Sequence, residues 1–260
     1  MAYVRAAASA FYISMRLRFI SGFAIMGVVV FPLIFAAVGL FVLNHPGTSP
    51  TQWTYGVLGG GLIGYWGIAY LDAGNSIQIE RWNGTLEPLL GVPTPLWVII
   101  LGKVCGGLVW GMLAFIPTVA LAYFGFHAVL PHLDAVNFVV SFALLTFSFL
   151  AIALALTPMF ALWRWAFSMI NGFELGTYVF CGFMFPVTIL PGWAQAVSAL
   201  LAPTWATRAL YASTTAEGAH DFAVWWALSI VLSVVYLALS LLLYRVVEKR
   251  ARVSGELALA

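Results

Sequence analysis

The side chains that could do chemistry are few in this chain, and their spacing does not converge on a catalytic or metal centre. The histidines all fall between long apolar stretches: His45, His127, His132 and His220. Paired ligation of a haem from facing helices is therefore not expected. No glycine-rich phosphate loop ending in Lys-Ser or Lys-Thr is present either. We predict no catalytic residue, no metal site and no cofactor bound by this chain.

Two acids, Asp72 and Glu174, stand inside otherwise apolar stretches. Ionisable groups are expensive in hydrocarbon and often face cavities or partners. For Glu174, a place in a pathway or subunit interface and a purely structural hydrogen bond both stay open. Asp72 is expected near the inner membrane boundary in a structural pair. Cys105 and Cys181 also lie in apolar segments, so we interpret them as buried free thiols.

The composition explains where such residues must sit. The chain has 260 residues, of which 63% are hydrophobic and only 8% charged, too little polar surface to cover a soluble fold. A helix crosses a bilayer with about 20 apolar residues. The sequence therefore predicts an all-α integral membrane protein, a single transmembrane domain over residues 1–260. Six spans are expected, at about 20–43, 53–76, 95–125, 136–158, 166–186 and 222–244.

The basic residues predict the orientation of these spans, because lysine and arginine near span ends are retained in the cytoplasm. Ten of them share one face of the six-span arrangement: Arg5, Arg16, Arg18, Arg81, Lys103, Arg164, Arg245, Lys249, Arg250 and Arg252. Only Arg208 falls on the other face. Both termini are therefore predicted to be cytoplasmic in a multi-pass protein. The net charge of +2 is too small and dispersed to indicate nucleic-acid binding.

Residues 1–19 combine small and aromatic residues with arginines, which favours a helix in the cytoplasmic interface of the membrane. Glycines recur in the second and third spans, at Gly56, Gly60, Gly64, Gly102, Gly106, Gly107 and Gly111. Such spacing allows helices to approach closely. Packing inside one subunit and contact between two copies are both consistent with it.

A charged loop, residues 77–94, follows the second span. It holds Glu80, Arg81 and Glu87, while Gly84 offers a turn and Thr85 a side chain that could cap a short helix. A short amphipathic helix here would expose its charges in the cytoplasm. The residues alone fit a docking surface for a soluble partner and an ordinary solvated loop equally well.

The segment before the last span is apolar but broken by proline. Pro186, Pro191 and Pro203 prevent one straight helix, and the segment is too short to cross the bilayer twice. We predict a re-entrant pair of short helices over 187–215 that dips into the outer leaflet and returns. Arg208 would lie near the outer headgroups.

At these two segments the chain resembles the type 2 permeases of ATP-binding-cassette transporters, a family of bacterial drug, lipo-oligosaccharide and polysaccharide exporters. The first matching motif comprises Glu80-Arg81, Gly84-Thr85-Leu86-Glu87, Leu89-Leu90, Pro93 and Gly102-Lys103. The second comprises Gly182, Phe185-Pro186, Leu190-Pro191, Trp193, Pro203-Thr204 and Arg208. Both occur in the family's order, and the six-span layout extends the resemblance over essentially the whole chain.

The resemblance implies a permease subunit in a prokaryotic plasma membrane, paired with a second permease chain, identical or related. Two copies of a separate ATPase would bind ATP and Mg²⁺. It also implies coupling to that ATPase through Glu80, Arg81, Gly84, Thr85 and Glu87, with Arg16 and Arg18 bracing the coupling region. Positions at a pathway or interface would include Glu174, Gly182, Pro186, Pro191 and Arg208.

The cargo is open between amphiphilic small molecules, which we favour, and lipid-linked glycans. An ion-coupled secondary transporter commonly shows repeated halves and helices broken at the midplane. This chain shows no repeat, and its broken segment is expected toward the outer face. An intramembrane enzyme would need convergent histidines, cysteines or carboxylates, which are absent from the sequence pattern.

Overall fold

The computed structural model describes residues 2–43, 50–85, 88, 91–92, 94–127, 133–162, 169–215 and 221–254. Within these residues the fold is helical and contains no strand. The main helices are α1 (Ala2–Ile20), α2 (Gly22–Leu43), α3 (Pro50–Trp82), α5 (Leu96–Gly111), α6 (Phe115–Ala120), α7 (Ala135–Leu162), α9 (Ile170–Phe180), α10 (Gly192–Leu200), α11 (Ala202–Ala212) and α12 (Phe222–Ser254). The predicted all-α class is confirmed.

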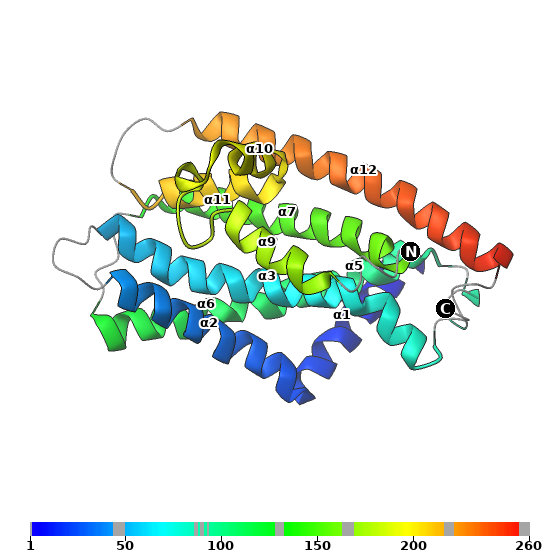
Figure 1. The fold of residues 1–260 in the computed structure, drawn as a ribbon. Helices are drawn as coiled ribbons and strands as arrows, with labels where there is room; N and C mark the ends of the chain where they lie inside the picture. The colour runs from blue at the N-terminus through cyan, green and yellow to red at the C-terminus, as the bar shows by residue number, and fades with distance from the viewer. Residues whose placement is uncertain are drawn as a thin grey trace.

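Four helical segments are long and apolar enough to cross a membrane: Gly22–Leu43, Leu96–Gly125, Ala135–Leu162 and Phe222–Lys249. The third predicted span is thus one segment in which α5 passes through a 3-10 turn into α6 and a final wider turn. The chain is a membrane-embedded protein. The start of α1 and the end of α12 lie toward the same end of the helix bundle (Figure 1).

The predicted second span, 53–76, lies inside α3, which is 33 residues long. Yet α3 is not among the four apolar helices, because glycine and aromatic residues fill its middle. Tyr65 and Trp66 are fully buried there, and α3 packs against α2, α5, α6, α7 and α9. This helix is therefore surrounded mainly by protein, and the extreme hydropathy of a lipid-facing helix is not needed.

The repeated glycines are used for packing inside this chain. A Cβ at Gly60 would lie 2.6 Å from the Cβ of Ala36 on α2, and one at Gly111 would lie 2.9 Å from the Tyr65 carbonyl oxygen on α3. A Cβ at Gly102 would collide with the backbone of α1. The glycines let α2 and α5 approach α3, and let α1 approach α5.

The predicted span 166–186 is wrong at its end, because α9 stops at Phe180 after 11 residues. Gly182 has a φ of +69°, and its amide donates to the Val179 carbonyl. The Phe183 amide donates to the Tyr178 carbonyl at 3.2 Å. This is a Schellman motif, which ends a helix through a left-handed residue that glycine adopts without strain. Residues 163–168, at the start of the predicted span, lie outside the described residues.

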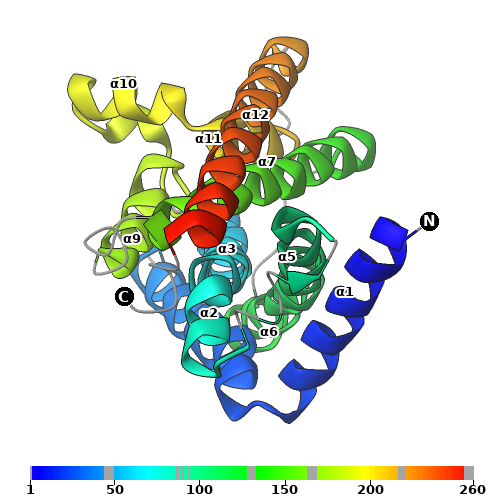
Figure 2. The same cartoon turned by 90° about the vertical axis from the view of Figure 1, so that its right-hand side faces the viewer.

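Two short helices, α10 and α11, occupy the predicted segment 187–215. The backbone between them is extended at Leu201, and the Trp205 indole closes the pair by donating to the Ala199 carbonyl at 2.9 Å. Pro191 precedes the first helix and Pro203 lies in the first turn of the second, where a missing N–H costs nothing. Helix α11 packs against α12, and the end of α10 is joined to α12 by the Tyr236 hydroxyl, which donates to the Leu200 carbonyl at 2.6 Å, while the rest of α10 projects away from α12 (Figure 2).

Candidate functional site

Several polar residues gather where α1, α3 and α5 meet, near the end of the bundle that holds the start of α1 and the end of α12. We call this group the α1–α3–α5 cluster. It consists of Ser14, Arg18, Asp72, Glu80, Thr85 and Lys103. Seen along the bundle, α1 lies beside α5 and away from α12 (Figure 2). The cluster therefore joins a peripheral helix to the centre of the fold.

The buried half of the cluster is an ion pair between Arg18 on α1 and Asp72 on α3. The Arg18 side chain is only 8% exposed and that of Asp72 is 27% exposed. The second guanidinium arm donates to the Ser14 hydroxyl at 2.6 Å, which in turn donates to the Lys103 carbonyl at 3.3 Å. A buried charge needs such a complete set of partners, because losing one leaves the other desolvated and unpaired.

Glycines on α5 make room for this ion pair. A Cβ at Gly106 would lie 3.1 Å from Nη1 of Arg18, and one at Gly107 would collide with the Asp72 carboxylate. Helix α5 thus faces the pair with bare backbone, and the arginine passes over it from α1 to reach α3. The absence of side chains at Gly106 and Gly107 therefore leaves the space that the Arg18–Asp72 ion pair occupies.

The more exposed half of the cluster is an ion pair between Glu80 and Lys103. The Thr85 hydroxyl also donates to the Glu80 carboxylate, and the Thr85 amide donates to the Glu80 carbonyl at 2.9 Å. Gly84, with φ +67°, makes the turn that brings Thr85 back. Burial alone would raise the pKa of Glu80, but the hydrogen bonds from Lys103 and Thr85, with the lysine charge, bring it below its ordinary value.

The geometry of α3 explains why its two acids face the neighbouring helices α1 and α5. Asp72 and Glu80 are eight residues apart, so they lie on one face about two turns from each other. Through Arg18 the first acid holds α1, and through Lys103 the second holds α5. A displacement of the end of α3 would therefore be transmitted to both neighbouring helices.

A third contact at this end reaches α5 from the last helix. The Glu248 carboxylate on α12 accepts a hydrogen bond from the Leu96 amide at 2.8 Å. Leu96 is the first residue of α5, whose free N–H groups and helix dipole favour an anion. Pro95 brings no capping side chain of its own. Glu248 was not predicted from the sequence, because its partner lies 152 positions away and basic residues follow it directly.

The predicted coupling and bracing residues are placed as follows. Glu80, Thr85 and Arg18 belong to the α1–α3–α5 cluster, and Gly84 supplies its turn. Arg16 is exposed, because it precedes Arg18 by two residues and so points to nearly the opposite side of the helix. Arg81 is described only in its backbone, and Glu87 lies outside the described residues. Among the described residues, Arg18 contacts Asp72 and Ser14 rather than the loop, and Ser14 links it to the Lys103 carbonyl.

The residues predicted at a pathway or interface lie on α9 and the segment that follows it. Glu174 accepts a hydrogen bond from the Tyr178 hydroxyl one turn later, and both face Gly67 of α3. A Cβ at Gly67 would lie 3.0 Å from each of their oxygens. Glu174 thus has a hydroxyl partner, as the structural interpretation expected, and it is half-buried rather than enclosed.

The broken backbone after α9 is satisfied by side chains of α11. The Thr204 hydroxyl donates to the Phe180 carbonyl at 3.4 Å, and the buried Tyr211 hydroxyl donates to the Phe183 carbonyl. Irregular backbone at membrane depth is stable only when protein or water provides such partners. Gly182 is buried in this turn, Pro186 is half-buried after it, and Pro191 is exposed before α10.

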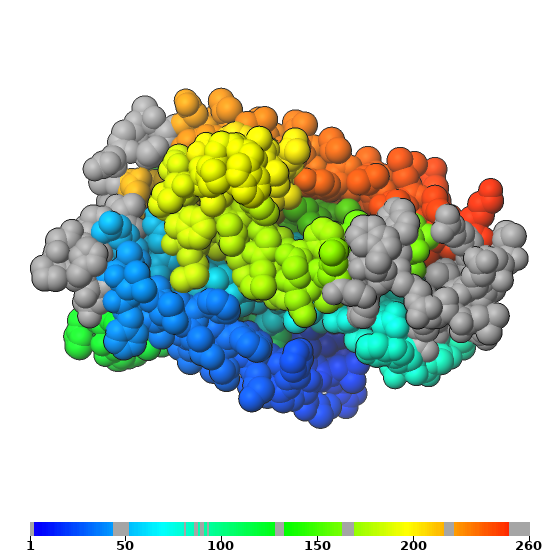
Figure 3. All heavy atoms as spheres, viewed as in Figure 1, coloured from blue at the N-terminus to red at the C-terminus, as the bar shows by residue number. Residues whose placement is uncertain are grey.

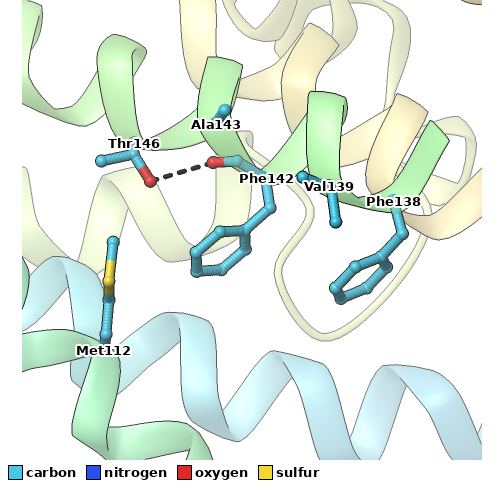
Figure 4. Close-up of a pocket in the computed structure, with 6 residues that line it drawn as sticks. All are labelled: Met112, Phe138, Val139, Phe142, Ala143 and Thr146. Carbon is cyan, nitrogen blue, oxygen red and sulfur yellow. Dashed lines mark hydrogen bonds between the residues drawn. The ribbon is translucent and has the colours of Figure 1, made fainter. Parts of the chain in front are cut away.

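An apolar groove of about 370 Å³ lies between α7 and the 3-10 turn after α5 (Figure 4). Its lining residues are Met112, Phe138, Val139, Phe142, Ala143 and Thr146. The Thr146 hydroxyl is the polar group of this lining, and it donates to the Phe142 carbonyl at 2.9 Å and accepts from the Tyr65 hydroxyl at 2.8 Å. The groove therefore suits an apolar chain rather than a polar ligand.

The part of the chain that the structure describes holds no group of three or more His, Cys, Asp and Glu residues able to bind a metal ion. No protein-family model matches the chain, and no curated protein matches it significantly. The features that bear on function are therefore the sequence motifs and the geometry of the α1–α3–α5 cluster.

Proposed function

We propose that this chain is the membrane-spanning permease subunit of an ATP-binding-cassette exporter of the type 2 family. It moves an amphiphilic or lipid-like substrate outward, using ATP hydrolysed by a separate ATPase subunit. The chain itself is not catalytic, and ATP and Mg²⁺ belong to the ATPase. Two permease chains, most simply two copies of this one, and two ATPase subunits form the complex.

In this proposal the protein lies in a prokaryotic plasma membrane with both termini in the cytoplasm. Four apolar helices, the central α3 and the region around α9 provide six crossings, and α10 with α11 forms the re-entrant pair. Helix α1 lies in the inner interface, where exposed Tyr12, Leu17 and Ile20 meet lipid. The retained basic residues at that end support this orientation.

The observation that carries the proposal is the α1–α3–α5 cluster at the predicted cytoplasmic end. Glu80 of the motif that resembles the coupling loop is tied to Lys103, another residue of the same motif. Asp72 and Arg18 extend the connection to α1. An ATPase that pushes the loop after α3 would thereby move three helices together, which is what a coupling region requires.

An amphiphilic cargo is supported by the apolar groove at Met112 and Phe142, which offers contact to hydrocarbon and almost no polar group. A soluble cargo would need several hydrogen-bonding side chains in its site. We therefore keep amphiphilic small molecules as the substrate class and regard lipid-linked glycans as the next alternative.

Affinity purification of the full chain from its native host in mild detergent, with quantitative mass spectrometry, tests this function. We expect a cassette ATPase in equal amount to the permease. The variant Glu80→Lys places a second lysine beside Lys103 and is expected to reduce ATPase recovery. The control Arg5→Lys keeps its charge and is expected to leave the recovery unchanged. Repeated purification without any ATPase would contradict the proposal and favour an ion-coupled transporter.

A further inference from the structure

One cation stands at the opposite end of the bundle from the α1–α3–α5 cluster. Arg208 lies on α11, at the level of the first turns of α3 and α12. It is the one basic residue outside the face predicted to be cytoplasmic. Its side chain is half-buried, so a specific environment surrounds it rather than bulk solvent.

Two tryptophans hold the guanidinium. Its central carbon is 5.4 Å from the ring centroid of Trp205 and 5.8 Å from that of Trp225. Trp205 is fixed in turn by its hydrogen bond to the Ala199 carbonyl. Nearby, Tyr55 of α3 stacks on Tyr211 of α11 with centroids 4.0 Å apart. Aromatic rings attract a cation through their faces and leave its N–H donors unused.

No acid neutralises this cation among the described residues. Both ion pairs found in the described ranges are at the other end of the bundle. Asp134, at the same end as Arg208, instead accepts hydrogen bonds from Asn137 at the start of α7. None of the described hydrogen bonds uses the five N–H donors of Arg208. A half-buried guanidinium with unused N–H donors favours an anion as its partner.

The neighbouring surface indicates which anion. Helix α10 and the turn before it are strongly exposed and apolar: Ile189 is 71% exposed, Trp193 68% and Leu200 66%. Figure 3 shows this segment protruding at the surface of the molecule. The end of α10 is joined to this site, because the Ala199 carbonyl accepts from Trp205, which lies against the guanidinium. Together the apolar surface and the cation fit a molecule that carries an anionic head and long apolar chains. A guanidinium fork matches the oxygens of a phosphate.

We propose that Arg208, held between Trp205 and Trp225, binds the phosphate of a phospholipid headgroup, while the surface of α10 contacts the acyl chains. The site does not depend on the ATPase assignment, since it requires only that the chain lie in a bilayer. It is a lipid site at the predicted outer leaflet, separate from the α1–α3–α5 cluster.

Native mass spectrometry of the purified full chain tests the site with dioleoyl phosphatidylglycerol as probe. We expect one tight lipid site whose Kd rises about tenfold in Arg208→Gln, because a charge-assisted bidentate contact is lost. Arg208→Lys keeps the charge without the fork and is expected to lie between the two. Arg5→Gln, which removes an exposed arginine at the other end, leaves the tight site unchanged.

Two further measurements keep the result specific. Dioleoylglycerol, which has the same chains and no phosphate, should bind wild type and Arg208→Gln equally. Circular dichroism and gel filtration show whether Arg208→Gln is folded. If it is misfolded, Trp225→Leu takes its place, because it removes one of the two rings that hold the guanidinium and should weaken lipid binding. Equal phosphatidylglycerol affinity in wild type and both well-folded variants would overturn the proposal, as would inorganic phosphate that displaces the lipid at the same concentration.

Discussion

The two ends of the helix bundle treat charge in opposite ways. In the α1–α3–α5 cluster, Arg18 and Lys103 each find a carboxylate within the chain. At the other end Arg208 is held by indole rings and has no ion pair among the described residues. Internal pairing fixes helices to one another, whereas a cation clamped by aromatic rings keeps its donors for a ligand. We propose that the first region transmits force and that the second binds a ligand.

The largest effect is expected from a substitution that removes the buried ion pair of the α1–α3–α5 cluster. Arg18→Ala leaves the Asp72 carboxylate half-buried beside bare α5 backbone, with its partner gone. Because removing one partner of a buried pair costs about 3–5 kcal/mol, and Asp72 keeps some exposure, we expect a loss near 3 kcal/mol. Thermal unfolding in detergent, followed by circular dichroism, measures it. The exposed Arg16→Ala should stay within about 0.5 kcal/mol of wild type, and an equal loss in both variants would refute the special role of Arg18.

The glycines beside the ion pair give the next largest effect. Gly107→Ala places a methyl group against the Asp72 carboxylate, so overpacking should cost about 1–3 kcal/mol. Gly172→Ala on α9 is the matched control, since a Cβ there meets no atom within 4 Å. The same unfolding experiment should show the control equal to wild type or slightly more stable. Tolerance of alanine at both positions would mean that α5 is not closely packed against the Arg18–Asp72 ion pair.

A smaller effect is expected from the contact between α12 and α5. Glu248→Ala removes the acceptor for the Leu96 amide and a favourable charge at the start of α5, which should cost about 1 kcal/mol. Glu248→Gln keeps an acceptor and should lose less. Hydrogen exchange of the first turn of α5 reports on this contact directly, with the exposed Lys249→Ala as control. Unchanged protection in Glu248→Ala would exclude a capping role.

The smallest effect is the pH dependence carried by Glu80. Its pKa is lowered in the folded protein, so its ionised form stabilises the fold above the ordinary carboxyl pKa of about 4.3. That contribution is lost as the pH falls through the lowered folded value. Because the ion pair lies near the surface, with 18% of the Glu80 side chain and 25% of the Lys103 side chain exposed, solvent screening should keep the contribution below about 1 kcal/mol. The stability difference between wild type and Glu80→Gln should therefore shrink on acidification, and a difference that grows would contradict the assigned sign.

The sequence predicted the parts of this molecule that depend on composition and short spacing. Long apolar runs located the four membrane helices, and the glycine repeats identified close helix contacts. The end of α9 was not predicted, because the residues on both sides of Gly182 are apolar and hydropathy does not reveal the left-handed turn that ends the helix there. Within the site, Glu80 and Thr85 could be selected from one loop, since they are five residues apart. The pairing of Arg18 with Asp72 joins residues 54 positions apart, so only the folded chain brings them together.

The central claim, that the α1–α3–α5 cluster couples an ATPase to the permease, is tested most directly by a charge exchange between Glu80 and Lys103. The assay measures substrate-stimulated ATP hydrolysis of the full complex in liposomes, using Glu80→Lys, Lys103→Glu and the double variant. We predict that each single variant loses most of the stimulation, because like charges then face each other, and that the double variant recovers it. Equal stimulation in wild type and both single variants would contradict the coupling role.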